Sequence, residues 1–237
     1  MNNNLIIVRG GGDVATGTIQ KLNRVGFDVL VLEIDKPTCI RRNVAVGQAI
    51  YDGEIQIEDI KAVRCDNIDD IETAFENSNV AVTVDPEGKY IKELQPLAVV
   101  DGILAKKNLG TSKDMAPITI GLGPGFEAGI DVDVVIETNR GHDLGRLIFE
   151  GFAQANTGNP GNINGYTTER ILRASDDGKL HIIKDLGSVV KKGQAVASVN
   201  GNEILSGLDG MVRGMINEGS EVFKGMKIGD VLSLIHI

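Results

Sequence analysis

The fold of this chain is decided by the stretch Leu5-Ile6-Ile7-Val8-Arg9-Gly10-Gly11-Gly12-Asp13-Val14-Ala15-Thr16-Gly17-Thr18-Ile19-Gln20-Lys21-Leu22. Its first four residues are apolar, which is typical of a strand buried on both faces in a parallel sheet. The three glycines that follow allow a tight turn and a close approach of the backbone to a phosphate group. Apolar residues then recur at helical spacing, and Gly26 provides a stop. A strand, a glycine turn and a helix in this order predict an anion site, because the first N–H groups of a helix have no helical partner.

The turn matches a dinucleotide-binding fingerprint of the form Gly10-x-Gly12-x-x-Ala15. A second apolar run ends in Glu33, about 20 residues beyond the turn, where an acidic residue would contact a ribose hydroxyl. The alternative is a turn that only packs a helix on a sheet, with the Asp13 carboxylate as a cap that competes with a phosphate. The predicted cofactor-binding residues of this region are Gly10, Gly11, Gly12, Asp13, Ala15, Thr16, Gly17 and Glu33.

Composition excludes several classes of protein. With 24 basic and 33 acidic residues among 237, the net charge is −9, which argues against a nucleic-acid binder. The N-terminus lacks the basic start and long apolar core of a signal peptide, and no run has the length of a transmembrane helix. Two cysteines are too few for a disulfide framework, and three histidines make a closed zinc site improbable, so no metal site is predicted. These features predict a cytoplasmic protein without a membrane partner.

The first two thirds of the chain alternate strands with short helices, which predicts a Rossmann-like parallel-sheet domain over residues 1–155. Strands are expected at 29–32, 60–63, 80–85, 98–101, 117–120 and 134–137, and helices at 13–25, 44–50, 68–75 and 90–94. Ligands collect at the carboxyl ends of such strands. The loops after Val8, Glu33, Ile120 and Ile136 are therefore expected to line one edge of the sheet.

Two of these loops contain candidate site residues. Gly121, Gly123 and Gly125 could form a second anion-binding nest, although Pro124 removes one donor and favours a rigid turn. In the second loop, Asn139 and Arg140 precede His142-Asp143, a candidate proton-transfer pair or anion clamp. The alternative for that pair is a helix start, with Asp143 near the cap.

The last third predicts a separate all-β domain. Residues 156–165 are rich in Asn and Gly and are predicted to be a linker, and short alternating apolar runs fill residues 166–237. The sequence G-S-x-V-x-K-G occurs at Gly187–Gly193 and again at Gly219–Gly225, which suggests two similar halves. This repeat resembles the barrel-sandwich hybrid of biotinyl and lipoyl domains. The hairpin tip expected at Val199–Ile204 has no lysine, so neither biotin nor lipoate is predicted.

The whole chain resembles the YqeB-like accessory proteins of the selenium-dependent molybdenum hydroxylase system, distant relatives of the xanthine dehydrogenase accessory proteins. The blocks that carry this resemblance are Arg9–Gly17, Pro37–Arg42, Gly121–Phe126, Glu137–Gly145, Thr157–Gly161, Glu169–Ala174 and the β-repeat. The resemblance implies a role in maturing a molybdenum hydroxylase, with its subunits as partners. It does not define a reaction.

Cys39 is the strongest candidate for handling sulfur or selenium. The guanidinium groups of Arg41 and Arg42 would favour its thiolate, and they could themselves bind a phosphate or pterin dianion. The alternatives are a small buried thiol beside a turn and salt bridges to the many carboxylates of the chain.

The sequence favours a maturation protein that binds a phosphorylated ligand: molybdenum cofactor, or a nucleotide such as NAD(P), ATP or CTP. Two other hypotheses remain open, an NAD(P)-dependent oxidoreductase of a small metabolite and a non-catalytic adaptor that docks on the hydroxylase. The sequence leaves the oligomeric state open, a homodimer included. The final residues Leu232–Ile237 match what a common transposon-adapter end encodes in one reading frame. We therefore expect a truncated β-domain, in which His236 has no biological role.

Overall fold

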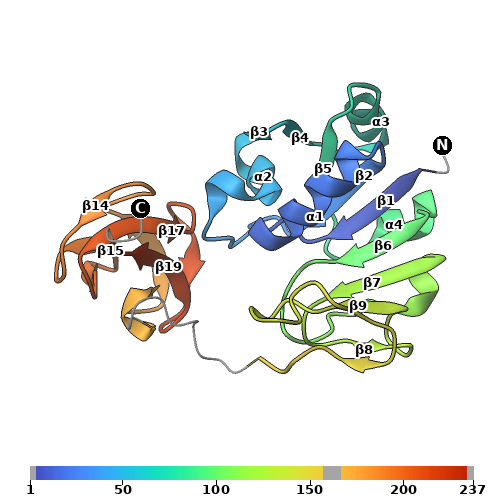
Figure 1. Cartoon of the computed structure of the whole chain (residues 1–237). Helices are drawn as coiled ribbons and strands as arrows, with labels where there is room; N and C mark the ends of the chain where they lie inside the picture. Colours follow the sequence, from blue (N-terminus) through green and yellow to red (C-terminus); the bar gives the residue numbers. More distant parts are fainter. Residues whose placement is uncertain (1–3, 157–166, 234–237) are drawn as a thin grey trace. The chain divides into compact units, whose positions relative to one another are not determined.

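The computed structural model describes residues 4–156 and 167–233, which form two compact units (Figure 1). We call them the α/β unit, which contains residues up to 37 and from 43 to 156, and the β unit, which contains residues 38–42 and the described residues from 167 onward. The predicted linker at 156–165 and the block at Thr157–Gly161 lie outside the described residues except for Asn156. The end of the predicted adapter-like tail, 234–237, also lies outside them.

The α/β unit is built on a nine-stranded sheet of order β10-β9-β7-β6-β1-β2-β5-β4-β3. Neighbouring strands are parallel except in the pairs β3/β4 and β9/β10, which are antiparallel and lie at the two edges. The strands are β1 (Leu5–Arg9), β2 (Asp28–Glu33), β3 (Glu54–Ile57), β4 (Ile60–Arg64), β5 (Val80–Val84), β6 (Ala98–Asp101), β7 (Ile118–Leu122), β9 (Val134–Ile136) and β10 (Leu147–Ile148). A separate pair is formed by β8 (Glu127–Ala128) and β11 (Gly151–Phe152).

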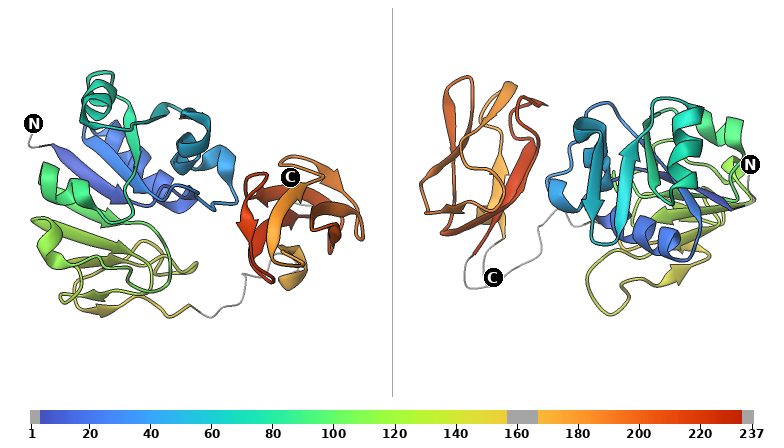
Figure 2. Two further views of the ribbon diagram at one scale, coloured as in Figure 1. Left: turned by 180° about the vertical axis from the view of Figure 1, so that it is seen from behind. Right: turned by 90° about the horizontal axis from the view of Figure 1, so that it is seen from above.

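Helices cover both faces of this sheet, as the uninterrupted apolar strands predict. The helical elements are α1 (Asp13–Arg24), α2 (Ala49–Asp52), α3 (Ile68–Glu76), α4 (Lys89–Leu94) and the 3-10 turns η1 (Arg42–Val44), η2 (Val46–Gln48) and η3 (Lys113–Met115). Ile6 and Val8 of β1 point into a core with α1, η2 and α2, whereas Leu5 and Ile7 point into a core with α3 and α4 (Figures 1 and 2). Alternate side chains of one strand therefore fill two cores.

The strand order reverses direction at β1, because β2 lies on one side of β1 and β6 on the other. This is the switch point of a doubly wound sheet, where the loops after the two strands diverge and leave room for a ligand. The predicted mixed α/β class is confirmed. The predicted helix at 44–50 differs in detail, since it consists of two 3-10 turns followed by the short α2, and β3 was not predicted.

The β unit consists of two four-stranded sheets of order β12-β19-β17-β14 and β16-β15-β13-β18, with antiparallel neighbours throughout. Its elements are η4 (Thr168–Arg170), β12 (Ile171–Arg173), β13 (Gly178–Ile182), β14 (Val189–Val190), β15 (Ala195–Val199), β16 (Asn202–Leu205), β17 (Gly210–Met215), β18 (Glu221–Val222) and β19 (Lys227–Leu232). Fifteen buried apolar residues of these elements and their turns form one core. The predicted all-β character of this region is confirmed.

The two copies of the repeat occupy equivalent places in the two sheets. Gly187 and Gly219 both have positive φ and precede the edge strands β14 and β18, one in each sheet. The N–H of Gly187 donates to Val212 O at 2.9 Å, and that of Gly219 donates to Leu180 O at 2.9 Å. Each copy therefore begins with a glycine turn that ties it to a strand from elsewhere in the unit.

A short segment from the N-terminal third completes the β unit, which differs from the predicted domain boundaries. The backbone N–H of Met215 donates to Ile40 O at 2.7 Å, and Arg41 forms a parallel bridge with Met215. Ile40 packs against the core of the β unit. Residues 38–42, which the sequence placed in the α/β domain, thus pair with the end of β17.

Candidate functional site

The glycine turn lies at the switch point, between the end of β1 and the start of α1. Packing alone requires glycine at its first two positions. Gly10 has a φ of +89°, and a Cβ there would lie 2.9 Å from the Cα of Ile103. A Cβ on Gly11 would lie 2.7 Å from the backbone N of Gly47. Neither of these two glycines needs a ligand to explain it.

Gly12 is different, because the fold does not require glycine there. It is the N-cap of α1 with ordinary extended dihedrals, φ −67° and ψ 173°, and a Cβ at this position would meet nothing within 4 Å. A Ser, Thr, Asp or Asn would cap the helix better. No side chain supplies a cap bond at this residue. The space around the Cβ position of Gly12, at the start of α1, is therefore open. Gly17, one turn further, is exposed and also faces open space.

Ala15 and Thr16 connect the helix to its surroundings. A Cβ on Gly102, just after β6, would lie 2.8 Å from the Cβ of Ala15, so the helix and sheet are in close contact at the third position of the fingerprint. The Thr16 hydroxyl donates to Gly12 O at 2.9 Å and accepts from the Val46 N–H at 3.0 Å. These residues position the turn.

Glu33, at the end of β2, holds the glycine turn with one carboxylate oxygen. Its Oε1 accepts from the Gly11 N–H at 2.7 Å, and its Oε2 accepts from the Ile34 N–H at 2.9 Å. Burial raises the pKa of this carboxyl, and the two backbone donors partly offset that rise. Glu33 thus lies beside the turn, as the fingerprint predicts, and already accepts two hydrogen bonds from the protein.

The glycine turn is in contact with the 3-10 turn η2, which the sequence did not predict. The Gly47 N–H donates to Gly11 O at 2.8 Å, and a Cβ on Gly47 would lie 3.1 Å from Glu33 Oε1. The 3-10 turn η2 therefore packs directly on one side of the glycine turn. The local sequence contains no signal for this contact, because Gly47 lies inside an apolar run that only suggests a helix.

A buried polar network supports the same edge. Arg9, 6% exposed, donates through Nη1 to the Thr111 hydroxyl, which in turn donates to Asp101 Oδ2 at 2.6 Å. Arg9 Nη1 also lies 3.7 Å from Asp101 Oδ2, and Nη2 donates to the carbonyls of Pro86 and Leu109. The network ties the ends of β1 and β6 to the loops after β5 and β6. An arginine directly after four apolar strand residues was the signal that could have identified it.

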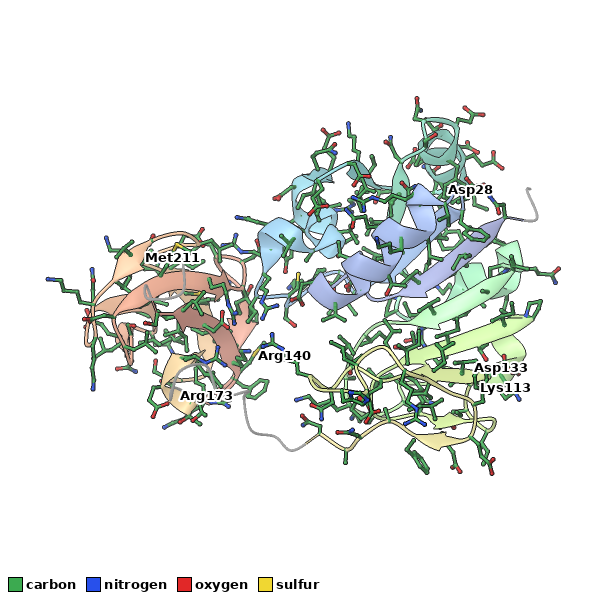
Figure 3. All side chains as sticks on the ribbon, in the orientation of Figure 1. Asp28, Lys113, Asp133, Arg140, Arg173 and Met211 are labelled. Carbon is green, nitrogen blue, oxygen red and sulfur yellow. The ribbon has the colours of Figure 1, made fainter. Side chains whose placement is uncertain are left out.

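The loop between β9 and β10 is ordered by Glu137, which is 2% exposed. Its two carboxylate oxygens accept the backbone N–H groups of Asn139 and Gln154, each at 2.7 Å. The Asn139 amide donates to Gln154 Oε1 at 2.6 Å. Arg140 lies at the carboxyl edge, opposite Asp28, Lys113 and Asp133 at the amino edge (Figure 3).

His142 and Asp143 lie in the same hairpin loop, and their side chains have different surroundings. The side chain of His142 is exposed. Asp143 forms an ion pair with Arg146 at 3.4 Å and accepts from Gln154 Nε2 at 3.5 Å. Within the part of the chain that the structure describes, the polar contacts of Asp143 therefore go to these two residues. A proton-transfer role for the pair stays a prediction.

Packing accounts for all three glycines of the second glycine loop. A Cβ on Gly121 would lie 2.5 Å from the ring of Phe126, and one on Gly123 would lie 2.5 Å from the Thr138 hydroxyl. A Cβ on Gly125 would lie 2.7 Å from the backbone N of Lys107. The Gly123 N–H also donates to Ile136 O at 2.8 Å. The rigid-turn alternative explains this loop without a ligand.

Cys39, Arg41 and Arg42 belong to the β unit and not to the unit that carries the glycine turn. Cys39 is in no disulfide, and its exposure is intermediate. Arg42 donates through Nε to Met215 O at 2.8 Å and forms an ion pair with Asp185. Arg42 thus fastens the segment to the β unit. The residues predicted to bind a cofactor are therefore divided between the two units.

The described residues, 4–156 and 167–233, contain neither a metal-binding cluster nor a membrane-spanning helix. Within them, no group of three or more His, Cys, Asp or Glu side chains is placed to hold a metal ion. None of their helices has the length and apolar character needed to cross a membrane.

Comparison with known proteins gives one close relative. No family model matches the sequence. A protein of Escherichia coli (strain K12) named "Uncharacterized protein YqeB" is 49% identical over 227 residues, which is 96% of this chain and 42% of that protein. The chain therefore spans less than half the length of this relative. The name agrees with the resemblance carried by the sequence blocks, and it states no function.

Solved structures give only weak likenesses. An aspartoacylase family protein from Mesorhizobium loti is 10% identical, with a TM-score of 0.30 over 97% of this chain and 85% of its own. The product-bound ectoine utilization protein EutE (DoeB) from Ruegeria pomeroyi is 21% identical, with a TM-score of 0.25 over 35% of this chain and 27% of its own. Likenesses at this level support no functional argument.

Proposed function

We propose that the α/β unit binds a phosphorylated ligand, a nucleotide or a pterin phosphate, in front of the N-terminus of α1. The observation that carries this proposal is Gly12. Packing explains Gly10 and Gly11, but Gly12 has ordinary dihedrals and open space around its Cβ position. A glycine that the fold does not need, at a helix N-terminus beside a switch point, is explained by close approach of a ligand to the backbone.

The biological role that we propose is maturation of a selenium-dependent molybdenum hydroxylase. Its support is the resemblance of the sequence blocks, and the protein would act in the cytoplasm on the subunits of that enzyme. Cys39 and Arg41 would handle sulfur, selenium or an anion. For the β unit we propose the barrel-sandwich hybrid architecture, supported by the equivalent places of the two repeat copies.

The test is a binding screen on the whole chain by thermal shift and calorimetry, with NAD(H), NADP(H), ATP, CTP and molybdenum cofactor. A ligand at a hundred times its dissociation constant stabilises the protein by about 3 kcal/mol. Gly12→Val should abolish that stabilisation while leaving the fold intact, since no atom lies within 4 Å of the new Cβ. Thr18→Val, on the same helix beyond the first turn, is the matched control and should retain binding. No stabilisation by any ligand would overturn the proposal.

A second candidate function is an NAD(P)-dependent oxidoreductase, favoured by Glu33 at the end of β2 beside the glycine turn. Absorbance changes of NADH linked to turnover would support it, and a failure of both nicotinamide cofactors to bind would exclude it. Should the screen show no ligand at all, the adaptor hypothesis predicts co-purification with hydroxylase subunits that Cys39→Ser and Arg41→Ala leave unchanged.

A further inference from the structure

Basic side chains from four segments of the β unit lie near one another. Arg170 from η4 and Arg213 from β17 pair with the buried carboxylate of Asp230. Lys227 from β19 and Arg41, from the segment that pairs with the end of β17, add further positive charge beside them. The strands β12, β19 and β17 are neighbours in one sheet, so these segments meet at one end of it. The chain as a whole has a net charge of −9, which makes such a concentration of cations unusual.

Asp230 binds two of these guanidinium groups. It is 3% exposed, and Arg213 contacts it through Nε at 3.3 Å and through Nη2 in a close ion pair. Arg170 Nη1 lies 4.0 Å from Asp230 Oδ2. Gly214 makes room for the carboxylate, since a Cβ there would lie 2.7 Å from Asp230 Oδ1. One negative charge is therefore shared between two arginines.

Lys227 brings a further positive charge to the same place. Loss of hydration lowers the pKa of its ammonium group, and the charges of Arg41, Arg213 and Arg170 lower it further, against the opposite effect of Asp230. Its register partner on β12 is Arg173, whose Nη1 donates to Gly225 O at 2.8 Å (Figure 3). Like charges that face each other across a strand pair are destabilising. The fold thus holds the Lys227 ammonium group where neighbouring arginines repel its positive charge.

We propose that this cluster is an oxyanion site for a phosphoryl group, with Asp230 holding Arg213 in place and the exposed Lys227 and Arg173 facing the ligand. A phosphate dianion would offset the repulsion between these cations, and guanidinium groups match phosphate oxygens in geometry. The site is separate from the glycine turn and does not depend on the function proposed for it.

The experiment titrates the whole chain with inorganic phosphate and, separately, with ADP, using NaCl at equal ionic strength as the reference. Backbone amide shifts of residues 170–173 and 227–230 report binding at this cluster. Lys227→Gln should weaken phosphate binding roughly tenfold, as expected for loss of one charged partner. Lys191→Gln removes the same charge from the same unit at an exposed lysine directly after β14, the edge strand on the opposite side of the sheet from β12, and it should bind as the wild type does.

Gly12→Val separates this proposal from the previous one, because the amide shifts around Lys227 should persist in that variant. Phosphate alone saturating the site identifies the free ion as a sufficient ligand. ADP binding more tightly than phosphate, with the same loss in Lys227→Gln, identifies a phosphoryl group on a larger molecule. Shifts no larger than those in NaCl, or equal binding by wild type and Lys227→Gln, would overturn the proposal and leave the cluster a purely structural ion-pair group.

Discussion

At the scale of single residues, neighbouring positions of one turn are occupied by glycine for different reasons. Gly11 is fixed by the backbone of Gly47, whereas Gly12 faces open space. The fingerprint treats its glycines as a set, and the structure separates those that the fold requires from the one that a ligand would require. Stability measurements can make the same distinction.

We expect Gly11→Ala to lower the free energy of unfolding by about 1–3 kcal/mol, the usual cost of overpacking, because its Cβ would lie 2.7 Å from the Gly47 nitrogen. Gly12→Ala should cost about 0.5 kcal/mol, the loss of a tolerated N-cap residue. Urea denaturation of the two variants checks this difference. Equal costs would show that the Gly47 cover does not restrain the turn.

The two cysteines should differ in reactivity. Burial raises the pKa of the Cys65 thiol from 9.0 to about 11, whereas Cys39 is partly exposed. A disulfide reagent at about pH 8 should therefore label Cys39 in the folded protein and reach Cys65 only after unfolding.

The same shift predicts how stability depends on pH. The unfolded thiol loses its proton above pH 9 while the folded thiol keeps it to about pH 11, so Cys65 contributes stability below pH 9 that is lost as the pH rises through this window. Cys65→Ala should lose less stability than the wild type over that window. An identical decline in both would contradict the assignment.

At the scale of elements, buried and half-buried carboxylates order the loops at the carboxyl edge. Glu33 holds the glycine turn, Asp101 anchors the network with Arg9, and Glu137 holds the hairpin between β9 and β10. Each lies at or just after the end of a strand of the parallel sheet. Acidic residues after apolar strands therefore have a structural use here in addition to any contact with a ligand.

Glu137→Gln should lower the free energy of unfolding by about 2 kcal/mol, because an amide has only one acceptor oxygen and one of the two hydrogen bonds to the charged carboxylate is lost. Amide hydrogen exchange of Asn139 and Gln154 should become faster. Glu150→Gln, at an exposed position of the same region, is the control and should change stability by less than about 0.5 kcal/mol. If the two variants behave alike, Glu137 does not order the hairpin.

At the scale of the whole molecule, the two units are not consecutive along the chain. The chain crosses from one unit to the other three times, whereas two consecutive domains would need one crossing. Residues 38–42 belong to the β unit, where they pair with the end of β17, and the chain then returns to the α/β unit. Met215 and Ile40 are joined by a 2.7 Å backbone hydrogen bond although 175 residues separate them. The β unit is therefore built from two distant parts of the sequence.

Ile40→Ala should lower the thermal stability of the β unit and leave that of the α/β unit unchanged. The reason is that Ile40 packs against the hydrophobic core of the β unit. A partly buried isoleucine gives an expected loss of about 1–3 kcal/mol. Calorimetry of the whole chain should show one transition moving and one fixed. Val44→Ala, exposed and outside the segment, is the control. Movement of both transitions would show that the units do not unfold separately.

Local patterns in the sequence were enough to predict the strand, glycine turn and helix at residues 5–24, the parallel sheet and the all-β region. Apolar runs, helical periodicity and glycines at positive φ act over a few residues, so they are visible in the chain itself. They also placed Glu33 beside the turn. The tertiary structure alone decided that Gly47 covers Gly11, that residues 38–42 join the β unit and that Arg170 and Arg213 pair with Asp230. These contacts join residues far apart in the chain, and they arise because each unit must close its own core, a condition that no short stretch of sequence expresses.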